Sequence, residues 1–373
     1  MNKRFCFAII CYALLVHGCA GTKKNAKAFS PSLKQSFEKI FLIGTALNAE
    51  QIEEKDINAV KLVPAEFSAI TPENIMKCEM IHSGWDQYNF NLPDKFVEYG
   101  KRHHMFVVGH TLIWHSQLSP FVSKITTSDS LMQFMTNHIT TIVGRYNGKV
   151  NGWDVVNEAL NEDGTMRHSV FLEKLGEDFV TKAFDLASKA APDAELYYND
   201  YNIEQPAKRA GAIALIKKVQ AAGVKITGVG IQGHWSINNL PINDLENAII
   251  EFAALGIKVM ITELDLTVLP NPWDLKGADV NQNFENSPLM NPYLKGLPDF
   301  VDVKLADSYE SLFRLFLKHK DKIGRVTFWG VSDGQSWLNN WPIKNRTNYP
   351  LLFDRNFQKK SAYKRVLALT EKN

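Results

Sequence analysis

Short apolar runs alternate with amphipathic stretches along most of this chain of 373 residues. In the stretches between the runs, apolar residues recur every three to four positions, which is the spacing of one helix face. Strands that alternate with helices predict a parallel sheet, because each crossover returns the chain to the same edge. Eight runs are expected to be strands: residues 41–47, 59–67, 105–114, 152–158, 195–202, 228–235, 258–266 and 325–333.

Helical spacing is clearest in six of the intervening stretches. Eight strand–helix units favour closure into a single (β/α)8 barrel of the α/β class, in which active sites lie at the C-terminal ends of the strands. An open, doubly wound sheet is the main alternative on the pattern alone. The six stretches are residues 94–102, 131–146, 170–191, 207–222, 245–255 and 308–319.

One long segment interrupts this alternation. Residues 270–298 directly follow the seventh expected strand, are rich in proline and asparagine, and show little periodicity. Loops of this length in a compact domain are usually functional or mobile. In a barrel the segment would lie on the catalytic face, where it either walls the cleft, with Trp273 as a possible substrate contact, or is a surface insertion without a role in chemistry.

The N-terminus has the organisation of a signal peptide. Lys3 and Arg4 are followed by an apolar run at 5–16, too short to span a bilayer as a helix. The sequence Val-His-Gly-Cys at 16–19 is similar to the cleavage box of bacterial lipoproteins. This predicts export across the inner membrane and lipidation at Cys19; a plain secretory leader cut nearby is the alternative.

A small, polar stretch at 20–30 separates this leader from the expected barrel and is typical of a tether. We therefore expect a signal peptide and tether at 1–30 and a catalytic barrel at 31–373. The lipid anchor would hold the protein in the cell envelope, at the outer membrane, with periplasmic and surface orientations both open. We expect no other contact with a membrane.

Composition narrows the classes of function. The net charge is +2 from 42 basic and 40 acidic residues, without a basic run in the body, so we expect no nucleic-acid partner. Of the four cysteines only Cys78 lies beyond the leader, which excludes an internal disulfide and a cysteine-based zinc site in the barrel. No glycine-rich phosphate loop follows any expected strand, so neither a cofactor nor a metal is expected for catalysis.

Two carboxylates stand where expected strands end. Glu158 ends the run at 152–158, and Glu263 lies near the end of the run at 258–266. A carboxylate at the end of a buried strand is costly unless it is paired or used. Taken alone, either one has the alternative of a surface residue or a salt bridge at the barrel mouth. Together, on the fourth and seventh strands, they fit the pair of carboxyl groups, about 5–5.5 Å apart, that retaining glycosidases use.

At this level of detail the sequence resembles glycoside hydrolase family 10, whose usual activity is endo-1,4-β-xylanase. The resemblance runs from about residue 41 to the C-terminus. It implies a (β/α)8 barrel that hydrolyses xylan and xylo-oligosaccharides by double displacement, with Glu158 as acid/base and Glu263 as nucleophile. The motifs that carry it are TPENIMK at 71–77, GHTLIWH at 109–115, NE at 157–158, GIQGH at 230–234, ITELD at 261–265 and FWGVSD at 328–333.

The resemblance also implies supporting roles. Asn157 would bond to the 2-hydroxyl of the cleaved sugar, and His234 would bridge Glu263 and Asp265; a barrel-interior histidine is the alternative for His234. Further residues would contact sugar, although Lys77 could instead form a structural ion pair and tryptophans are more often core residues. The expected sugar contacts are Glu73, Asn74, Lys77, His110, Trp114, Tyr201, Gln232, Trp329 and Trp337.

Two other functions remain open at this stage. A related β-1,4-glycanase, such as a cellulase or β-glucanase, would share the two glutamates but not necessarily the motifs at 71–77 and 109–115. A carbohydrate-binding lipoprotein on an inactive barrel would belong to a different class, although the retention of both glutamates argues against it.

Overall fold

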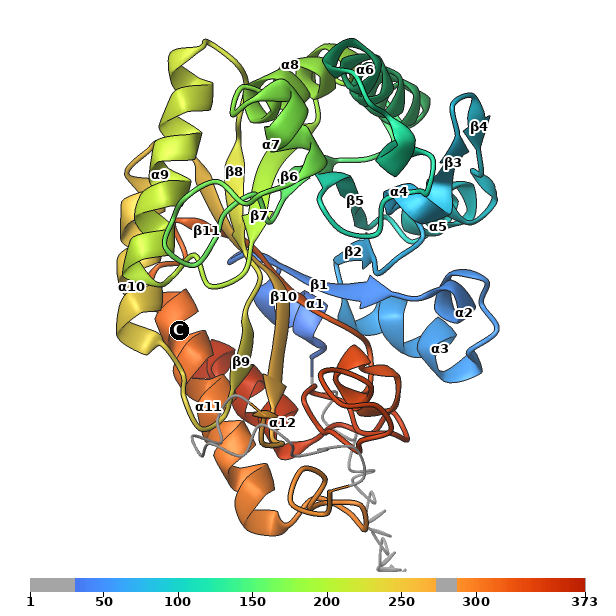
Figure 1. Cartoon of the computed structure of the whole chain (residues 1–373). Coiled ribbons are helices and arrows are strands. Elements are labelled where there is room, and N and C mark those ends of the chain that lie inside the picture. The colour runs from blue at the N-terminus through green and yellow to red at the C-terminus, as the bar shows by residue number, and fades with distance from the viewer. Residues whose placement is uncertain (1–30, 273–286, 373) are drawn as a thin grey trace, which may run out of the picture. The chain divides into compact units, whose positions relative to one another are not determined.

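Eight parallel strands form a closed barrel in the computed structural model, which describes residues 31–272 and 287–372. The ring closes because β11 pairs with both β10 and β1 (Figure 1). This confirms the expected barrel and rules out the open sheet. In order around the barrel the strands are β1 (Leu42–Leu47), β2 (Ala69–Pro72), β5 (Phe106–Trp114), β6 (Gly152–Asn157), β7 (Glu195–Asp200), β8 (Gly228–Ile231), β10 (Lys258–Thr267) and β11 (Ile323–Phe328).

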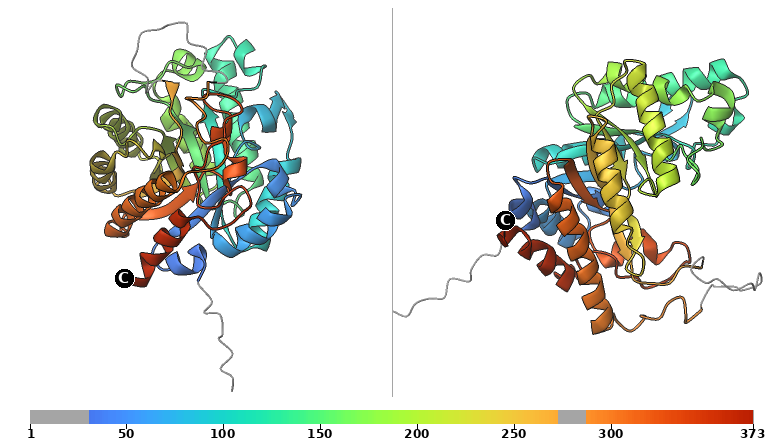
Figure 2. Two further views of the ribbon diagram at one scale, coloured as in Figure 1. Left: turned by 90° about the horizontal axis from the view of Figure 1, so that it is seen from below. Right: turned by 90° about the vertical axis from the view of Figure 1, so that its left-hand side faces the viewer.

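Helices lie around the strands, as the two views of Figure 2 show. The described helices are α1 (Leu33–Phe37), α2 (Ala49–Ile52), α3 (Ile57–Glu66), α4 (Cys78–Ile81), α5 (Asn91–Arg102), α6 (Ser128–Arg145), α7 (Val170–Leu175), α8 (Phe179–Ala190), α9 (Pro206–Ala221), α10 (Ile242–Ala253), α11 (Asp299–Lys318) and α12 (Ser361–Ala368). None of the helices within the described ranges is long and apolar enough to cross a bilayer.

Three shorter strands lie outside the barrel ring. β3 (His82–Gly84) and β4 (Gln87–Tyr88) form an antiparallel hairpin. β9 (His234–Ser236) pairs with β10 beyond the end of β8, after a turn in which Gly233 has a φ of 89°. The expected strand at 228–235 is therefore two strands, and the turn between them lies at the C-terminal end of β8.

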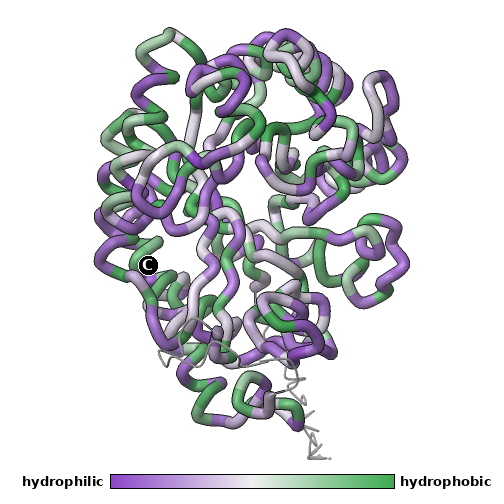
Figure 3. Tube along the Cα trace, in the orientation of Figure 1, coloured by the Kyte–Doolittle hydropathy of each residue, from purple (hydrophilic) through white to green (hydrophobic). Residues whose placement is uncertain are grey.

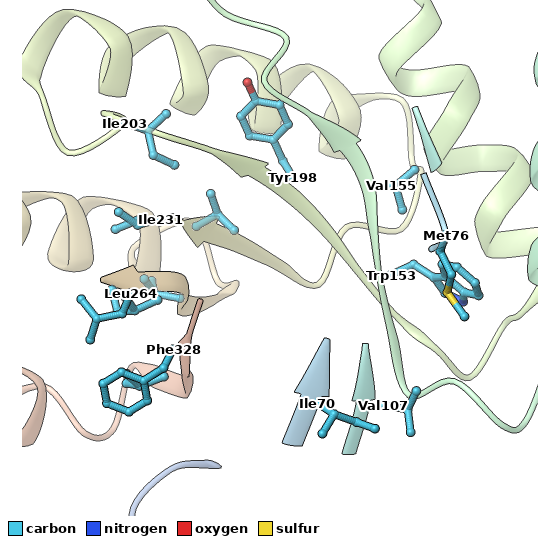
Figure 4. Close-up of a cluster of buried hydrophobic side chains, with 14 of the residues drawn as sticks. Ile70, Met76, Val107, Trp153, Val155, Tyr198, Ile203, Ile231, Leu264 and Phe328 are labelled. Carbon is cyan, nitrogen blue, oxygen red and sulfur yellow. The ribbon is translucent and has the colours of Figure 1, made fainter. Parts of the chain in front are cut away.

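The main core lies between the barrel and its helices. On α6, for example, Thr127 caps the N-terminus and the buried residues Leu131, Met135 and Ile139 follow one another at helical spacing. Figure 3 shows the resulting mixture of hydrophobic and hydrophilic positions along the outer helices. Figure 4 shows part of the core, in which labelled side chains come from several neighbouring strands, among them Ile70, Val107, Trp153, Tyr198, Ile231, Leu264 and Phe328.

A separate, smaller cluster fills the inside of the barrel. Val108, Tyr197 and Met260 are fully or almost fully buried and pack together with Phe106. The Arg325 guanidinium lies 5.3 Å from the Tyr197 ring centroid and 5.5 Å from that of Phe106, so a cation packs against two rings of this cluster. The barrel interior is therefore packed with side chains. In barrels of this kind active sites lie at the C-terminal ends of the strands.

The second expected strand, at 59–67, is wrong. This segment is helix α3, capped by the Asp56 carboxylate, and its buried residues Ala59, Val63 and Glu66 are three to four positions apart. The strand is β2, which begins at Ala69, shortly after the helix ends at Glu66, and all four of its residues are buried. The apolar run was too short to distinguish the spacing of a helix from that of a strand. The segment also contains Pro64, which argues against a helix on propensity alone.

The other expected elements differ mainly at their ends. The stretch at 170–191 is two helices, α7 and α8, separated at Gly176, whose φ is 67°. The last expected strand, 325–333, ends earlier, at Phe328. In the segment at 270–298, residues 287–298 form turns before α11 begins at Asp299; Trp273 and the rest of 273–286 lie outside the described residues, as do the signal peptide and Cys19.

Candidate active site

Two strand-end glutamates lie at the C-terminal end of the barrel. Glu158 directly follows β6, and Glu263 lies in the second half of β10. The Glu158 carboxylate accepts hydrogen bonds from Trp114 Nε1 at 2.9 Å and from Gln232 Nε2 at 3.0 Å. Side chains from the end of β5 and from the turn between β8 and β9 therefore hold it from two directions.

The second carboxylate belongs to a longer chain of hydrogen bonds. Glu263 is only 5% exposed and accepts from Asn199 Nδ2 at 2.8 Å, while its other oxygen lies 3.1 Å from His234 Nε2. The other His234 nitrogen lies 2.9 Å from Asp265 Oδ1. Asp265 in turn accepts from Trp337 Nε1 at 2.7 Å. The predicted bridge by His234 is present in this geometry.

The charges around Glu263 favour its ionised form. Burial alone would raise the pKa of its carboxyl group, but the hydrogen bond from His234, the nearby His110 ring and the Asn199 amide together lower that pKa below its usual value. Burial opposes the charge of His234 as well, yet the Asp265 and Glu263 carboxylates raise its pKa to about 10. At neutral pH this is a carboxylate held by an imidazolium, whose two ring nitrogens both donate.

Two amides connect the carboxylates to each other. Asn199 Nδ2 reaches Asn157 Oδ1 at 2.9 Å as well as Glu263. Gln232 Nε2 reaches the same Asn157 oxygen at 3.5 Å as well as Glu158. The Asn157 amide is therefore linked to both acids, to Glu263 through Asn199 and to Glu158 through Gln232.

A lysine adds positive charge to this floor. Lys77 is buried and donates to Asn74 Oδ1 at 2.8 Å, and its ammonium lies 5.0 Å from the Trp114 ring centroid. Burial lowers the pKa of Lys77, while the charges of nearby carboxylates, among them Glu263, Glu73 and Glu158, raise it. Burial likewise raises the pKa of Glu73, against the effect of Lys77. Within the described ranges Lys77 thus donates a hydrogen bond to an amide, and the neighbouring carboxylates act on it only through their charge.

His110 and Trp329 form a second part of the floor. His110 Nδ1 lies 2.9 Å from Asp154 Oδ2, which leaves Nε2 as the nitrogen available to other partners. The Trp329 ring meets the rings of His110 and His234 edge-on, at centroid distances of 5.3 and 6.4 Å. The indole therefore contacts the histidines beside Glu263, which the sequence did not specify.

Trp337 and Tyr201 lie on different sides of the site. The Trp337 ring contacts His234 at 4.9 Å, and Trp341, half-exposed, lies nearly parallel to it at 6.3 Å. Tyr201 follows β7 and accepts a hydrogen bond from Arg167 Nη2 at 2.6 Å. Since Arg167 also donates to the Glu158 carbonyl, Tyr201 belongs to the Glu158 side of the site.

Every predicted catalytic or sugar-contacting residue therefore has a contact or a charge interaction with another member of this cluster, directly or through Arg167. Cys19 lies outside the described residues. In the described ranges no group of three or more histidine, cysteine or acidic side chains is arranged to hold a metal ion. The arrangement offers one carboxylate kept ionised and a second held by two donors, which together suit acid-assisted nucleophilic displacement.

Comparison with known proteins assigns the family. The model of glycosyl hydrolase family 10 matches residues 32–369. The chain belongs to this family. An endo-1,4-beta-xylanase A of Xylanibacter ruminicola is 42% identical over 366 residues, covering 97% of this chain and 98% of the relative, and a beta-1,4-xylanase of Dictyoglomus thermophilum is 37% identical over 366 residues, again covering 97% and 98%. The resemblance expected from the motifs is confirmed.

Solved structures of family 10 proteins match the fold closely. A GH10 endoxylanase retrieved from a sugarcane soil metagenome superposes with a TM-score of 0.85 at 44% identity, covering 91% of this chain and 100% of that one. Xylanase 10B of Thermotoga petrophila, solved in complex with xylobiose, has a TM-score of 0.81 at 32% identity, covering 91% and 97%.

Sequence reasoning missed three residues of this family 10 site. Asn199 joins Asn157 to Glu263, Asp154 orients His110, and Arg167 holds the backbone at Glu158. Asn199 lies opposite Asn157 in the register of β6 and β7. A polar residue near the end of each of two consecutive expected strands could therefore have indicated that the two side chains meet.

Glycine at position 230 makes room for Asn199. A Cβ atom added to Gly230 would lie 2.3 Å from Asn199 Oδ1, closer than two such atoms approach. The glycine that opens the GIQGH motif is therefore explained by the position of an amide on the neighbouring strand, β7.

Proposed function

We propose that this family 10 chain is an endo-1,4-β-xylanase, which hydrolyses internal β-1,4-xylosidic bonds of xylan and xylo-oligosaccharides. The names of the relatives support this substrate, since they are xylanases that align over nearly their whole length with this chain. The observation that carries the chemistry is the pairing of an ionised Glu263, bonded to His234, with a Glu158 held at hydrogen-bonding distance from Trp114 and Gln232.

The proposed first step is a displacement at the anomeric carbon. A Glu263 oxygen forms a bond to that carbon while the bond from the carbon to the glycosidic oxygen breaks. Glu158 donates its proton to the departing oxygen, so the aglycone leaves as an alcohol. His234 and Asn199 hold Glu263 in place without contributing atoms to the product.

The second step returns both groups to their starting state. Glu158, now a carboxylate, takes a proton from a water molecule, and the water oxygen attacks the glycosyl–enzyme at the same carbon. The Glu263 ester bond breaks and the carboxylate is released. Two inversions give net retention of configuration. Asn157, which is linked to both acids, would bond to the 2-hydroxyl of the cleaved sugar.

The sugar contacts follow from the same arrangement. Lys77, Asn74 and His110 would bind hydroxyls of the unit that is cleaved, with Glu73 and Gln232 beside them. Trp329 and Trp337 offer flat apolar faces on which the C–H faces of a pyranose can pack. Tyr201, on the Glu158 side, would line the leaving-group half of the cleft.

Product analysis tests this proposal. The purified chain should release short β-1,4-xylo-oligosaccharides from linear xylan, with products first appearing as the β-anomer. Faster release of sugar from carboxymethyl cellulose than from xylan would indicate a cellulase or β-glucanase instead. Binding of xylan without release of reducing ends would indicate a glycan-binding protein, and products first appearing as the α-anomer would contradict the retaining mechanism.

We further propose that the mature protein is held in the cell envelope by lipid on Cys19. The support is the sequence at 1–30, with its basic start, short apolar run and Val-His-Gly-Cys ending. The full chain should incorporate labelled fatty acid and lose the label on Cys19→Ser. A mature N-terminus at any other residue would contradict lipidation.

A further inference from the structure

A single arginine holds three consecutive peptide carbonyls at the acid/base residue. Arg167 Nε donates to the Glu158 carbonyl at 3.0 Å, and Nη2 donates to the Leu160 carbonyl at 2.8 Å. The backbone N–H of the same arginine donates to the Ala159 carbonyl at 2.7 Å. Three of its N–H groups thus fix the path of the chain directly after β6.

This path includes an unfavourable backbone conformation. Glu158 has a φ of 54°, in the left-handed region that side chains other than glycine seldom adopt. Conformations of this kind persist only where the surroundings fix them, and they concentrate at functional sites. The Glu158 N–H donates to the Asn199 carbonyl at 2.9 Å and the Ala159 N–H to the Tyr198 hydroxyl at 3.2 Å. Strand β7 therefore holds the N–H groups, and Arg167 holds the carbonyls.

The backbone direction at Glu158 decides where its carboxyl group points. At this φ the carboxylate lies within hydrogen-bonding distance of Trp114 and Gln232. A relaxation to negative φ would rotate the side chain about the end of β6 and away from these two donors. The same guanidinium also donates to the Tyr201 hydroxyl at 2.6 Å, which couples this backbone to the leaving-group side of the cleft.

From these contacts we infer that Arg167 is a positioning residue, which keeps the Glu158 carboxyl group aimed at the glycosidic oxygen by clamping the strained backbone behind it. The inference rests on the proposed function, in which Glu158 is the acid/base. Among the residues that the structure describes, the side-chain hydrogen bonds of Arg167 go to two carbonyls and a phenol rather than to a carboxylate. It is thus placed as a clamp of backbone geometry.

The test compares substrates that need the acid with substrates that do not. Arg167→Lys keeps the positive charge, but an ammonium cannot bond to all three acceptors as the fork of a guanidinium does. Arg167→Met removes both the charge and the side-chain hydrogen bonds. For both variants kcat/KM on xylohexaose should fall about tenfold to a hundredfold. This is less than the full contribution of a positioned general acid to the rate, because the acid is displaced and not removed. On 2,4-dinitrophenyl β-xylobioside, whose phenolate leaves without a proton, kcat/KM should fall less than about threefold.

A second arginine provides the matched control. Arg209 is also buried and donates to a backbone carbonyl, that of Glu204, at 2.5 Å, but it belongs to α9 and its guanidinium reaches α10 through the Asp244 carbonyl. Arg209→Met should leave the ratio of the two kcat/KM values unchanged, whatever it does to stability. Equal losses on both substrates for Arg167→Lys, or no loss on xylohexaose, would overturn the clamp.

Arg167→Lys carries the test if Arg167→Met does not fold. A wild-type chain that hydrolyses neither substrate would remove the proposed function and the clamp together. A wild-type chain active on xylohexaose, with a substrate ratio that Arg167→Lys does not move, would remove the clamp alone.

Discussion

His234 lies between two carboxylates, with Nε2 3.1 Å from Glu263 and Nδ1 2.9 Å from Asp265. Both ring nitrogens can donate only when the imidazole carries its second proton, and the two anions raise the pKa of His234 to about 10. The charge of the ring in turn lowers the pKa of Glu263 despite its burial. The geometry thus assigns the ionised state to Glu263, the proposed nucleophile.

Replacing His234 by glutamine should move the acidic limb of the pH–rate profile to higher pH. Glutamine can donate one hydrogen bond to Glu263 but carries no charge, so the pKa of Glu263 rises. In the proposed mechanism this carboxyl attacks only when it is ionised, so activity should be lost as the pH falls through that pKa. The measurement is kcat/KM on xylan over a pH series. His319→Gln, which alters a histidine 2.7 Å from Glu246 between α10 and α11, should leave the limb unmoved, and an unmoved limb in His234→Gln itself would contradict the assignment.

The same histidine should make stability depend on alkaline pH. Its folded-state pKa, about 10, is above the ordinary value of 6.5, so the stabilisation is fully present below pH 6.5 and is lost as the pH rises through 10. The difference in the free energy of unfolding between wild type and His234→Gln should therefore shrink across this window. Denaturant unfolding at several pH values measures it. A difference that stays constant between pH 6.5 and pH 10 would mean that the ring is neutral in the folded protein over this range.

Replacing Glu158 by alanine should affect substrates according to their leaving group. Loss of a positioned acid lowers kcat/KM on xylan by about a hundredfold to ten-thousandfold, whereas a dinitrophenyl xylobioside needs no proton at departure and loses far less. Steady-state kinetics on both substrates decide the matter. Equal factors on the two substrates would assign Glu158 to binding and not to proton transfer.

Replacing Glu263 by alanine should abolish turnover of both kinds of substrate, because no group is left to form the glycosyl–enzyme. Azide fits the space that the side chain vacates and attacks from the same face, so it should restore a glycosyl azide of inverted configuration from the aryl substrate. Product configuration by NMR is the measurement. Residual turnover without azide would show that another group is the nucleophile.

The positions of the two glutamates were predictable from the sequence, because active-site residues of a barrel lie at the C-terminal ends of its strands. In a barrel the end of each strand lies on one face, so Glu158 and Glu263 could be placed together without knowing any side-chain contact. The helix at α3 was not predictable in the same way. A short apolar run satisfies both periods, and only the burial of Val63 and Glu66 on one face distinguishes them.

The residues that hold the acids were harder to find than the acids themselves. Asn199 acts on Asn157 because β6 and β7 are neighbours in register, which is a property of the folded sheet. Arg167 is brought back to Glu158 by a turn that the bridge between Leu160 and Met166 closes. Its role depends on this local geometry, which the spacing of apolar residues does not predict. Pairwise geometry of this kind appears only once the strands have been placed.

Removing the ammonium of Lys208 should destabilise the protein in a pH-dependent way. Lys208 is fully buried, with Nζ 3.0 Å from Asp200 Oδ1 and 3.5 Å from the Tyr201 ring centroid. Burial raises the pKa of Asp200 to about 7 even though Lys208 opposes it. In Lys208→Met a carboxylate would remain buried without its cation, at a cost of about 3–5 kcal/mol in the free energy of unfolding.

The sign of the pH dependence follows from the raised pKa of Asp200. A carboxyl whose folded pKa is raised contributes stability that is present below its ordinary pKa and is lost as the pH rises through about 7. Lys208 limits that loss while Asp200 is ionised, so the deficit of Lys208→Met should be small at pH 5 and large at pH 8. Chemical denaturation at these two pH values measures the deficit. Lys189→Met, which breaks an exposed pair with Asp185, should cost less than about 1 kcal/mol at either pH. A deficit for Lys208→Met as small as that control would mean that Asp200 is neutral in the folded protein and does not depend on its cation.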